Sequence, residues 1–401
     1  MKLAMREDGM RALLRVSITG IFVASAVAIT SSVVGADLVP SQPSDLSLKK
    51  EMARAIDRGS QWLVKNQAAD GTWSDADHPA VTSLALVALQ GDPEEHHREL
   101  KGPALAKGYK YLLDSVKPDG GIYRIESLMN YNTAVSILAL VVANNPEYHD
   151  TIRSARKFVI GGQQDYGDVG TVDNVLDGGV GYGNSYTHSD MSNTLLALEA
   201  LYYSRHLVED SGAGKTEDLD WNAAIQFIQN CQNLPEANKQ AWVSGDEQNK
   251  GGFIYFPGDS KAGEMKLSDG RTALRSYGSI SYAGLLSYIY ADLDADDARV
   301  GAVLDWLEKN YTLEENPGMG KQGLFYYFYT MSKALSLAGV KSFKTQDGVE
   351  VLWARKLALK MLDYQKEDGR WVNDNSRWWE KDPALVTSYA LLTVINLYSQ
   401  L

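Results

Sequence analysis

The stretch Gln67-Ala-Ala-Asp70-Gly71-Thr-Trp73 has a close copy near the other end of the chain, Gln365-Lys-Glu-Asp368-Gly369-Arg-Trp371. Weaker relatives of this repeat motif occur at residues 117–123, at 163–167, and at 231–233 followed by 251–253. Internal similarity of this kind is typical of repeat architectures, in which each repeat is one supersecondary unit that stacks on its neighbours. The repeat motif therefore indicates the fold class before any single element is considered.

The segments around the motifs are predicted to be helices of two alternating kinds. The helices before the motifs mix apolar and charged positions at helical spacing, so that one face meets water. They are expected at residues 52–65, 104–113, 152–159, 221–228, 300–311 and 351–364. The helices after the motifs are apolar nearly all round and should be buried on every side. They are expected at residues 80–89, 133–143, 193–203, 279–290, 324–337 and 384–397.

This alternation predicts an all-α (α/α)6 toroid over residues 46–401, with six inner helices wrapped by six outer ones. The Asp-Gly pair of each motif supplies the turn that ends an outer helix, because glycine tolerates a positive φ. The aromatic residue that follows is expected to pack under the next repeat. The motifs are thus predicted to build the ring and to carry no chemistry of their own.

Composition and charge restrict the partners of this domain. The 401 residues are 44% hydrophobic and 22% charged, which is ordinary for a globular protein. A formal net charge of −12 disfavours binding to nucleic acid. The single cysteine, Cys231, allows no internal disulfide and no cysteine-rich metal site. We therefore expect no metal and no cofactor.

The first thirty-six residues resemble a secretory leader. Lys2, Arg6 and two further arginines precede an uncharged run over residues 16–36, which ends on small residues of the kind that signal peptidase cleaves. We interpret residues 1–36 as a cleaved signal peptide and 37–45 as a short linker, which predicts a periplasmic or extracellular protein. An uncleaved anchor is the alternative, since about twenty uncharged residues just span a bilayer. Otherwise, contact with a membrane is expected only as the export route or as a transient surface contact.

The motifs resemble those of the squalene–hopene cyclase and protein prenyltransferase superfamily, whose repeat has the form Q-x-x-D-G-x-W. More narrowly, the chain resembles exported bacterial prenyltransferase and squalene oxidase repeat proteins. The segments that carry this resemblance are 181–194, 274–284, 316–323 and 377–383. The resemblance covers roughly residues 50 to 400 and implies a terpenoid-cyclase-like toroid.

The functional motifs of that superfamily are only partly present. The zinc site of protein prenyltransferases needs an Asp, a Cys and a His on inner helices, whereas Cys231 lies near the end of a predicted outer helix, with no Asp two residues before it. The cyclases protonate an alkene with the middle Asp of D-x-D-D, and residues 294–297 match that string. Here, however, the string opens an outer helix on the rim opposite the inner-helix starts. We therefore disfavour Asp296 as a catalytic acid and expect Asp297 to cap the helix. An EF-hand is also disfavoured, because Val303 stands where the loop needs a glutamate.

The starts of the inner helices should converge on one mouth, which favours anionic groups. The predicted ligand-binding residues there are Asp190, Asn193, Arg275, Tyr277, Gln322, Tyr326, Tyr327, Trp378 and Glu380. The candidate catalytic carboxylates are Asp190, Glu380, Asp382 and Asp77. His78, Asn130, Asn132 and His188 stand near the same helix starts. Asp190 has a second interpretation as a simple helix cap.

The leading functional hypothesis follows from the resemblance: a terpenoid-cyclase-like protein that binds or cyclises an apolar isoprenoid. Two alternatives remain open. One is a secreted glycosidase or polysaccharide lyase, which would need paired carboxylates or an Arg with a Tyr or His, and would bind carbohydrate. The other is a non-catalytic binding or scaffold toroid, which is favoured if side chains fill the centre of the ring.

Overall fold

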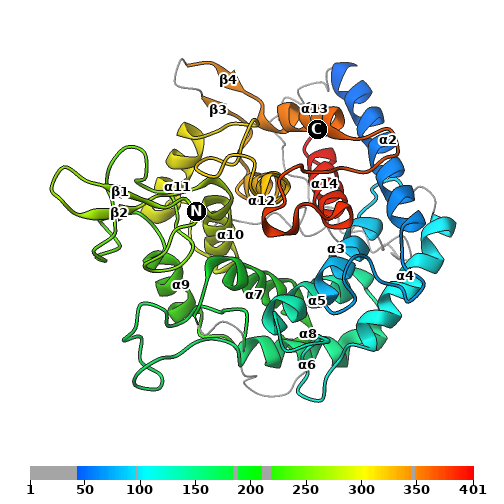
Figure 1. The fold of residues 1–401 in the computed structure, drawn as a ribbon, viewed down its shortest axis with the longest axis horizontal. Coiled ribbons are helices and arrows are strands. Elements are labelled where there is room, and N and C mark those ends of the chain that lie inside the picture. The colour runs from blue at the N-terminus through cyan, green and yellow to red at the C-terminus, as the bar shows by residue number, and fades with distance from the viewer. Residues whose placement is uncertain (1–42, 96–97, 184–187, 210–217, 345–347) are drawn as a thin grey trace, which may run out of the picture.

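Six helices form a closed inner ring in the computed structural model (Figure 1), which describes residues 43–95, 98–183, 188–209, 218–344 and 348–401. They are α3 (Pro79–Gln90), α5 (Met129–Ala143), α7 (Met191–Ser204), α10 (Gly278–Tyr290), α12 (Leu324–Leu337) and α14 (Pro383–Tyr398). Each packs against the next in chain order, and α14 packs against α3, which closes the ring. Most of their residues are buried, as expected for helices that are apolar all round.

Six amphipathic helices surround this ring. They are α2 (Pro43–Lys65), α4 (Arg98–Leu113), α6 (His149–Ile160), α9 (Trp221–Asn230), α11 (Ala298–Lys309) and α13 (Trp353–Tyr364). Each packs against at least one inner helix. The prediction of an all-α (α/α)6 toroid is confirmed. The first outer helix begins at Pro43, so the last residues of the predicted linker are helical, and the predicted signal peptide lies outside the described residues.

The remaining elements are short and lie at the edge of the ring. They are η1 (Pro146–Tyr148), α8 (His206–Glu209), η2 (Arg377–Trp379), and two antiparallel strand pairs, β1 (Glu264–Lys266) with β2 (Thr272–Leu274) and β3 (Phe343–Lys344) with β4 (Glu350–Val351). Glu264 lies opposite Leu274, and Phe343 lies opposite Val351. Both hairpins project outward from the ring (Figure 1). Over the described residues, no helix is both long enough and apolar enough to span a bilayer.

The repeat motifs connect consecutive outer helices through their glutamine. Gln67 donates from Nε2 to the carbonyl oxygens of Gly71 and Ala104, both at 2.9 Å. The first of these acceptors closes the motif's own turn, and the second belongs to the next outer helix, α4. Gln365 bonds in the same way to Gly369 and to Ala55 in α2, both at 2.8 Å. The last repeat is therefore bonded to the first, as a closed ring requires.

The glycine and the tryptophan of the motif complete this junction. Gly71 has a φ of 93°, and a Cβ on it would lie 2.5 Å from the carbonyl oxygen of Lys107 in α4. Only glycine meets both requirements. The Trp73 ring is buried, and its Nε1 donates to Leu63 O at 2.8 Å. Trp371 repeats this bond to Met361 O at the same distance. The motifs thus build the ring, as the sequence predicts.

Candidate functional site

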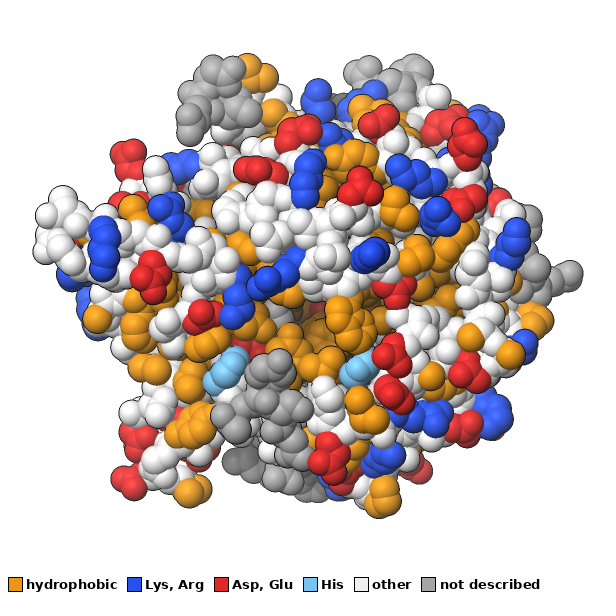
Figure 2. Space-filling model, viewed as in Figure 1, with side chains coloured by type: hydrophobic (Ala, Val, Ile, Leu, Met, Phe, Trp, Pro, Cys, Tyr) orange, Lys and Arg blue, Asp and Glu red, His pale blue; other side chains and the backbone are white. Residues whose placement is uncertain are grey.

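A cavity of about 650 Å³ lies at the centre of the ring, at the end where the inner helices begin. Its lining includes the residue before α3 (His78), the residue before α10 (Tyr277) and residues at the starts of α5 and α7 (Leu128 and Ser192). Figure 2 shows a hollow at the centre of one face, with apolar side chains gathered in it. The inner-helix starts therefore do converge on one mouth.

The walls of this cavity are apolar and rich in tyrosine. Aliphatic residues of the lining are Ala80, Val81, Leu84, Leu128, Val135, Leu138, Leu196, Ile280 and Leu385. Aromatic residues of the lining are Tyr131, Tyr182, Tyr255, Tyr277, Tyr326, Tyr329, Tyr389, Trp378 and Trp379. Burial raises the pKa of all seven tyrosines above its usual range. Their phenols are therefore neutral at physiological pH and present uncharged rings to the cavity.

A buried ion pair lies behind Tyr329, toward the ends of the inner helices. Lys333 on α12 donates from Nζ to Glu199 on α7 and, at 3.2 Å, to the hydroxyl of Tyr329, which lines the cavity. Both charged side chains are less than one-tenth exposed. Lys333 also lines a second hollow of about 90 Å³ on the far side, near the ends of the inner helices. This pair therefore lies between Tyr329, in the cavity lining, and the hollow on the opposite rim.

Two consecutive tryptophans stand at the mouth. Trp378 and Trp379 have φ values of 53° and 65°, in the left-handed region that non-glycine residues rarely adopt. The Arg377 guanidinium lies 5.5 Å from the centre of the Trp378 ring, and the His78 ring lies 5.1 Å from the Trp379 ring in an edge-on arrangement. Backbone strain of about 1–3 kcal/mol per residue persists where surrounding structure fixes it, and it is concentrated at functional sites.

Glu380 follows these tryptophans and is the one carboxylate of the cavity lining within the described residues. It accepts hydrogen bonds from Tyr326 N at 2.8 Å, Phe325 N at 3.2 Å and Asn373 Nδ2 at 2.6 Å. The first two donors belong to the first turn of α12, so Glu380 neutralises a helix terminus. Burial raises the pKa of Glu380, and these hydrogen bonds oppose the shift.

Asp190 lies behind the lining and is fully buried. It caps α7, because its Oδ1 accepts from Asn193 N at 2.9 Å, while its Oδ2 accepts from Asn193 Nδ2 at 2.7 Å. Burial raises its pKa to about 6, against the opposing effects of Asn193, His188 and Tyr255. Tyr255 and Tyr182 line the cavity, and their hydroxyl oxygens are 3.4 Å apart. The interpretation of Asp190 as a cap is therefore confirmed.

The structure brings some of the predicted site residues together and leaves others out. Tyr277, Tyr326, Trp378 and Glu380 line the cavity, whereas Asp190, Asn193, Arg275, Gln322 and Tyr327 lie outside the lining, as do Asp77 and Asp382.

Each excluded residue has a local reason. Arg275 is exposed and donates from Nε to Glu264 O at 3.1 Å in the β1–β2 hairpin. Tyr327 faces the outer ring, where its hydroxyl donates to Thr312 O at 2.9 Å. Asp382 caps α14, and Asp77 is exposed. Gln322 lies half-buried in the loop before α12.

Several lining residues were missed by sequence reasoning. Tyr131 and Tyr389 lie on inner helices within the helical pattern, and their inward direction depends on how each helix is rotated in the ring. Tyr182, Tyr255 and Lys261 come from loops. Two signals in the sequence point to these loops. Segment 181–194, which carries the family resemblance, contains Tyr182, and the long insertion between Asn233 and Tyr277 contains Tyr255 and Lys261.

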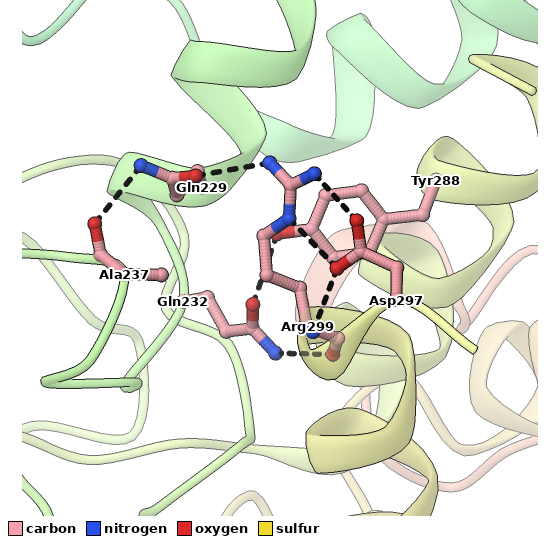
Figure 3. A network of polar contacts seen from close by, with 6 residues as sticks. All are labelled: Gln229, Gln232, Ala237, Tyr288, Asp297 and Arg299. Carbon is pink, nitrogen blue, oxygen red and sulfur yellow. Dashed lines mark hydrogen bonds and ion pairs between the residues drawn. The ribbon is translucent and has the colours of Figure 1, made fainter. Parts of the chain in front are cut away.

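The D-x-D-D string lies on the opposite rim, as its position predicts. Residues 294–297 lie between the end of α10 and the start of α11, and Asp296 is exposed. Asp297 caps α11 by accepting from Arg299 N at 2.8 Å, and it also binds the Arg299 guanidinium. Figure 3 shows that guanidinium held between Asp297 and Gln229, while the neighbouring Gln232 donates to the Arg299 carbonyl. This network links α9 to α11 and does not face the cavity.

No protein-family model and no curated protein matches this sequence. Among solved structures, the chain is similar to the type II terpene cyclase MstE from Scytonema. A variant of that enzyme without ligand aligns with a TM-score of 0.51 at 11% identity, over 89% of this chain and 99% of that chain. Another variant, in complex with its substrate geranylgeranyl dihydroxybenzoate, aligns with a TM-score of 0.50 at 10% identity, over 89% of this chain and all of that chain. At such identities the similarity lies in the fold. The chain therefore has a terpenoid-cyclase-like fold.

Proposed function

We propose that this protein binds an apolar isoprenoid in its central cavity. The observation that carries the proposal is the lining itself, in which aliphatic side chains and neutral aromatic rings surround about 650 Å³ at the centre of the ring. This volume lies within the range of about 300–1,000 Å³ typical of small-molecule sites. A fold shared with a cyclase that takes a geranylgeranyl-bearing substrate supports the same ligand class.

The lining disfavours the two alternatives. A glycosidase needs two carboxylates facing one another across the bond that breaks. Glu380 alone lines the cavity in the described part of the chain, while Asp77 and Asp382 lie outside it. A scaffold toroid would fill its centre with side chains, whereas this one encloses a cavity.

The geometry supports binding more strongly than catalysis. Rings around the cavity are suited to an alkene chain and to a positive charge, at about 0.5–2 kcal/mol per ring for a cation. Alkene protonation also needs an acid with a free proton aimed into the cavity. Glu380 is occupied by the amides of α12, and Asp190 lies behind Tyr255 and Tyr182. We therefore place binding first and cyclisation second.

The proposal extends to the subfamily and its location. We infer an exported prenyltransferase and squalene oxidase repeat protein, supported by the predicted leader at residues 1–36 and by the repeat motifs. N-terminal sequencing of the protein made in a bacterial host tests this. A mature N-terminus at or near residue 37 supports export, and an intact Met1 contradicts cleavage.

The test of binding combines extraction and titration. Lipids extracted from the purified protein and analysed by mass spectrometry should contain an isoprenoid. In a fluorescence titration, Leu196→Trp should weaken the binding of farnesol at least about tenfold, because Leu196 lines the cavity and a larger ring would fill it. Leu359→Trp is the matched control, since Leu359 is exposed on α13. Equal affinity in both variants would contradict the proposal. Product analysis after incubation with squalene tests cyclisation separately.

A further inference from the structure

The cavity lining changes character beyond the first turn of the inner helices. In this deeper part, the inner helices contribute the aliphatic residues Leu84, Val135, Leu138 and Leu196 and the two tyrosines Tyr329 and Tyr389. Among the described residues, the inner helices place no other polar side chain in this part of the lining. The hydroxyl groups of these tyrosines therefore determine which polar group a ligand can place there.

The two hydroxyl groups differ in their hydrogen bonds. Tyr389 is bonded to the side chain of Tyr131, another tyrosine of the lining. The Tyr329 hydroxyl oxygen instead accepts from Lys333 Nζ at 3.2 Å. An ammonium group has three donors and no acceptor, so the direction of this bond is fixed. The bond therefore leaves the O–H of Tyr329 able to donate elsewhere, and no described residue accepts it.

The surroundings of Tyr329 hold its side chain in place at the cavity wall. Tyr329 is half-buried and lines the central cavity but not the second hollow, so its exposed part faces the central cavity. Its ring stacks on that of Tyr389, with the ring centres 5.5 Å apart and the planes at 24°. Lys333, which fixes the hydroxyl oxygen, is itself bonded to Glu199. A hydroxyl that accepts from a cation is polarised and becomes a stronger donor.

The charges behind Tyr329 favour an uncharged ligand oxygen. Lys333 and Glu199 carry opposite charges and are both buried, so the pair adds no net charge to this part of the cavity. An anionic group there would lose its hydration without a net positive charge to replace it. A hydrocarbon would leave the Tyr329 donor without an acceptor. The oxygen of an alcohol avoids both costs.

We propose that Tyr329 forms a polar subsite in the deeper part of the cavity, and that this subsite binds the hydroxyl oxygen of an isoprenoid alcohol. The ligand would enter with its oxygen first and leave its hydrocarbon chain toward the mouth. Lys333 acts as a positioning residue, because it holds the Tyr329 oxygen and directs the O–H away from itself. This inference rests on the proposed function, since the same cavity would hold the chain.

The first test compares two ligands in two variants by fluorescence titration of the full-length protein. The ligands are farnesol and the same carbon skeleton without the hydroxyl group. Tyr329→Phe should weaken the binding of farnesol about tenfold, because the ligand oxygen loses its donor, and should leave the affinity for the hydrocarbon unchanged. Comparing the change in each ligand's affinity cancels the difference in their hydration.

Tyr327→Phe is the matched control for this test. It removes the same group from the same helix, but the Tyr327 hydroxyl donates to Thr312 O and lies outside the lining. This variant should change the affinity for neither ligand. Thermal unfolding of both variants checks that each is folded.

A second test needs no variant and so remains decisive if Tyr329→Phe folds poorly. A farnesol analogue with a diazirine near its hydroxyl group is bound to the wild type and photolysed, and mass spectrometry locates the label. We expect the label on residues of the deeper part, such as Leu138, Leu196 or Tyr329. A label on Trp378 or Trp379, at the mouth, would overturn the proposed orientation.

The outcomes separate this inference from the proposed function. If Tyr329→Phe left the affinity for farnesol unchanged, or weakened both ligands equally, the subsite would be overturned and isoprenoid binding would stand. Failure of both ligands to bind the wild type would overturn the proposed function itself.

Discussion

One loop, between α13 and α14, contains tryptophans in two contrasting environments. Trp371 belongs to the repeat motif, is completely buried and donates its indole N–H to Met361 O. Trp378 and Trp379 follow within eight residues, are 39% and 46% exposed, and have positive φ values. The first ring has a complete set of contacts in the protein. The other two stand at the cavity mouth, where a ligand would add contacts.

The glutamine of the motif and two polar side chains at the mouth differ in a similar way. In the repeat motifs, the side-chain amide of Gln365 bonds to two carbonyl oxygens. At the mouth, Asn132 Nδ2 and His78 Nδ1 are left unpaired. We therefore expect the Gln, Gly and Trp of the motifs to contribute mainly to stability, and the strained tryptophans of the mouth to contribute mainly to function. Four predictions test whether this division is real.

The largest expected effect is on stability, from truncation of a motif tryptophan. Trp371→Ala should lower the free energy of unfolding by about 3–5 kcal/mol, because it leaves a large cavity in the core and an unpaired Met361 carbonyl. Trp378→Ala, the matched variant at the mouth, should cost about 1 kcal/mol or less but weaken farnesol binding. Urea denaturation and fluorescence titration measure the two effects. Similar losses of stability in both variants would remove the distinction between the two regions.

The next effect concerns the pH dependence of stability at Asp190. Burial raises its pKa from 3.8 to about 6, so the folded chain binds this proton more tightly than the unfolded chain. The free energy of unfolding therefore falls as pH rises from about 4 to about 6, by about 3 kcal/mol for this group. Asp190→Asn keeps the cap acceptor and removes the titration.

The wild type should thus gain about 3 kcal/mol relative to Asp190→Asn when the pH is lowered from 7 to 4. Urea denaturation of both proteins at several pH values measures the difference. If the difference in free energy of unfolding between the two proteins did not change with pH, the carboxyl of Asp190 would be as accessible to water as that of a motif aspartate. That result would contradict the division between the two regions.

These regions also differ in how far they were predictable from sequence. The twelve helices were predictable because the two hydrophobic patterns are local and the Gln, Gly and Trp of each motif act within one turn and its neighbour. The cavity mouth was predictable from topology alone. The individual lining residues were not: Tyr327 and Tyr326 are adjacent, and only Tyr326 faces the cavity. Loop residues such as Tyr255 and Arg275 depend on how the insertion folds back.

A smaller effect is expected at Asp297, on the rim opposite the mouth. This aspartate caps α11 and binds Arg299, whose hydrogen bond lowers the pKa of the carboxyl. Asp297→Ala should therefore cost about 1 kcal/mol of stability through loss of the cap. Asp297→Asn keeps an acceptor and should cost less. Urea denaturation measures the free energy of unfolding of both variants. An equal loss in the two would mean that the ion pair with Arg299, and not the helix cap, provides the stabilisation.

The smallest expected effect is at Asp296, the residue that the D-x-D-D string marks as an acid. Asp296 is exposed in the loop between α10 and α11, whereas the cavity opens where the inner helices begin. The Glu199–Lys333 pair lies between the cavity and that opposite rim. A solvated carboxyl there has no path to an enclosed alkene, so Asp296→Asn should leave isoprenoid binding, and any cyclisation, unchanged. General acid catalysis contributes about 10²–10⁴ in rate, so its loss would be easy to detect. A hundredfold fall in product formation by Asp296→Asn, with the circular dichroism spectrum unchanged, would show that Asp296 is the catalytic acid. Because Asp296 lies on the rim opposite the mouth, that result would contradict the assignment of the functional site to the mouth.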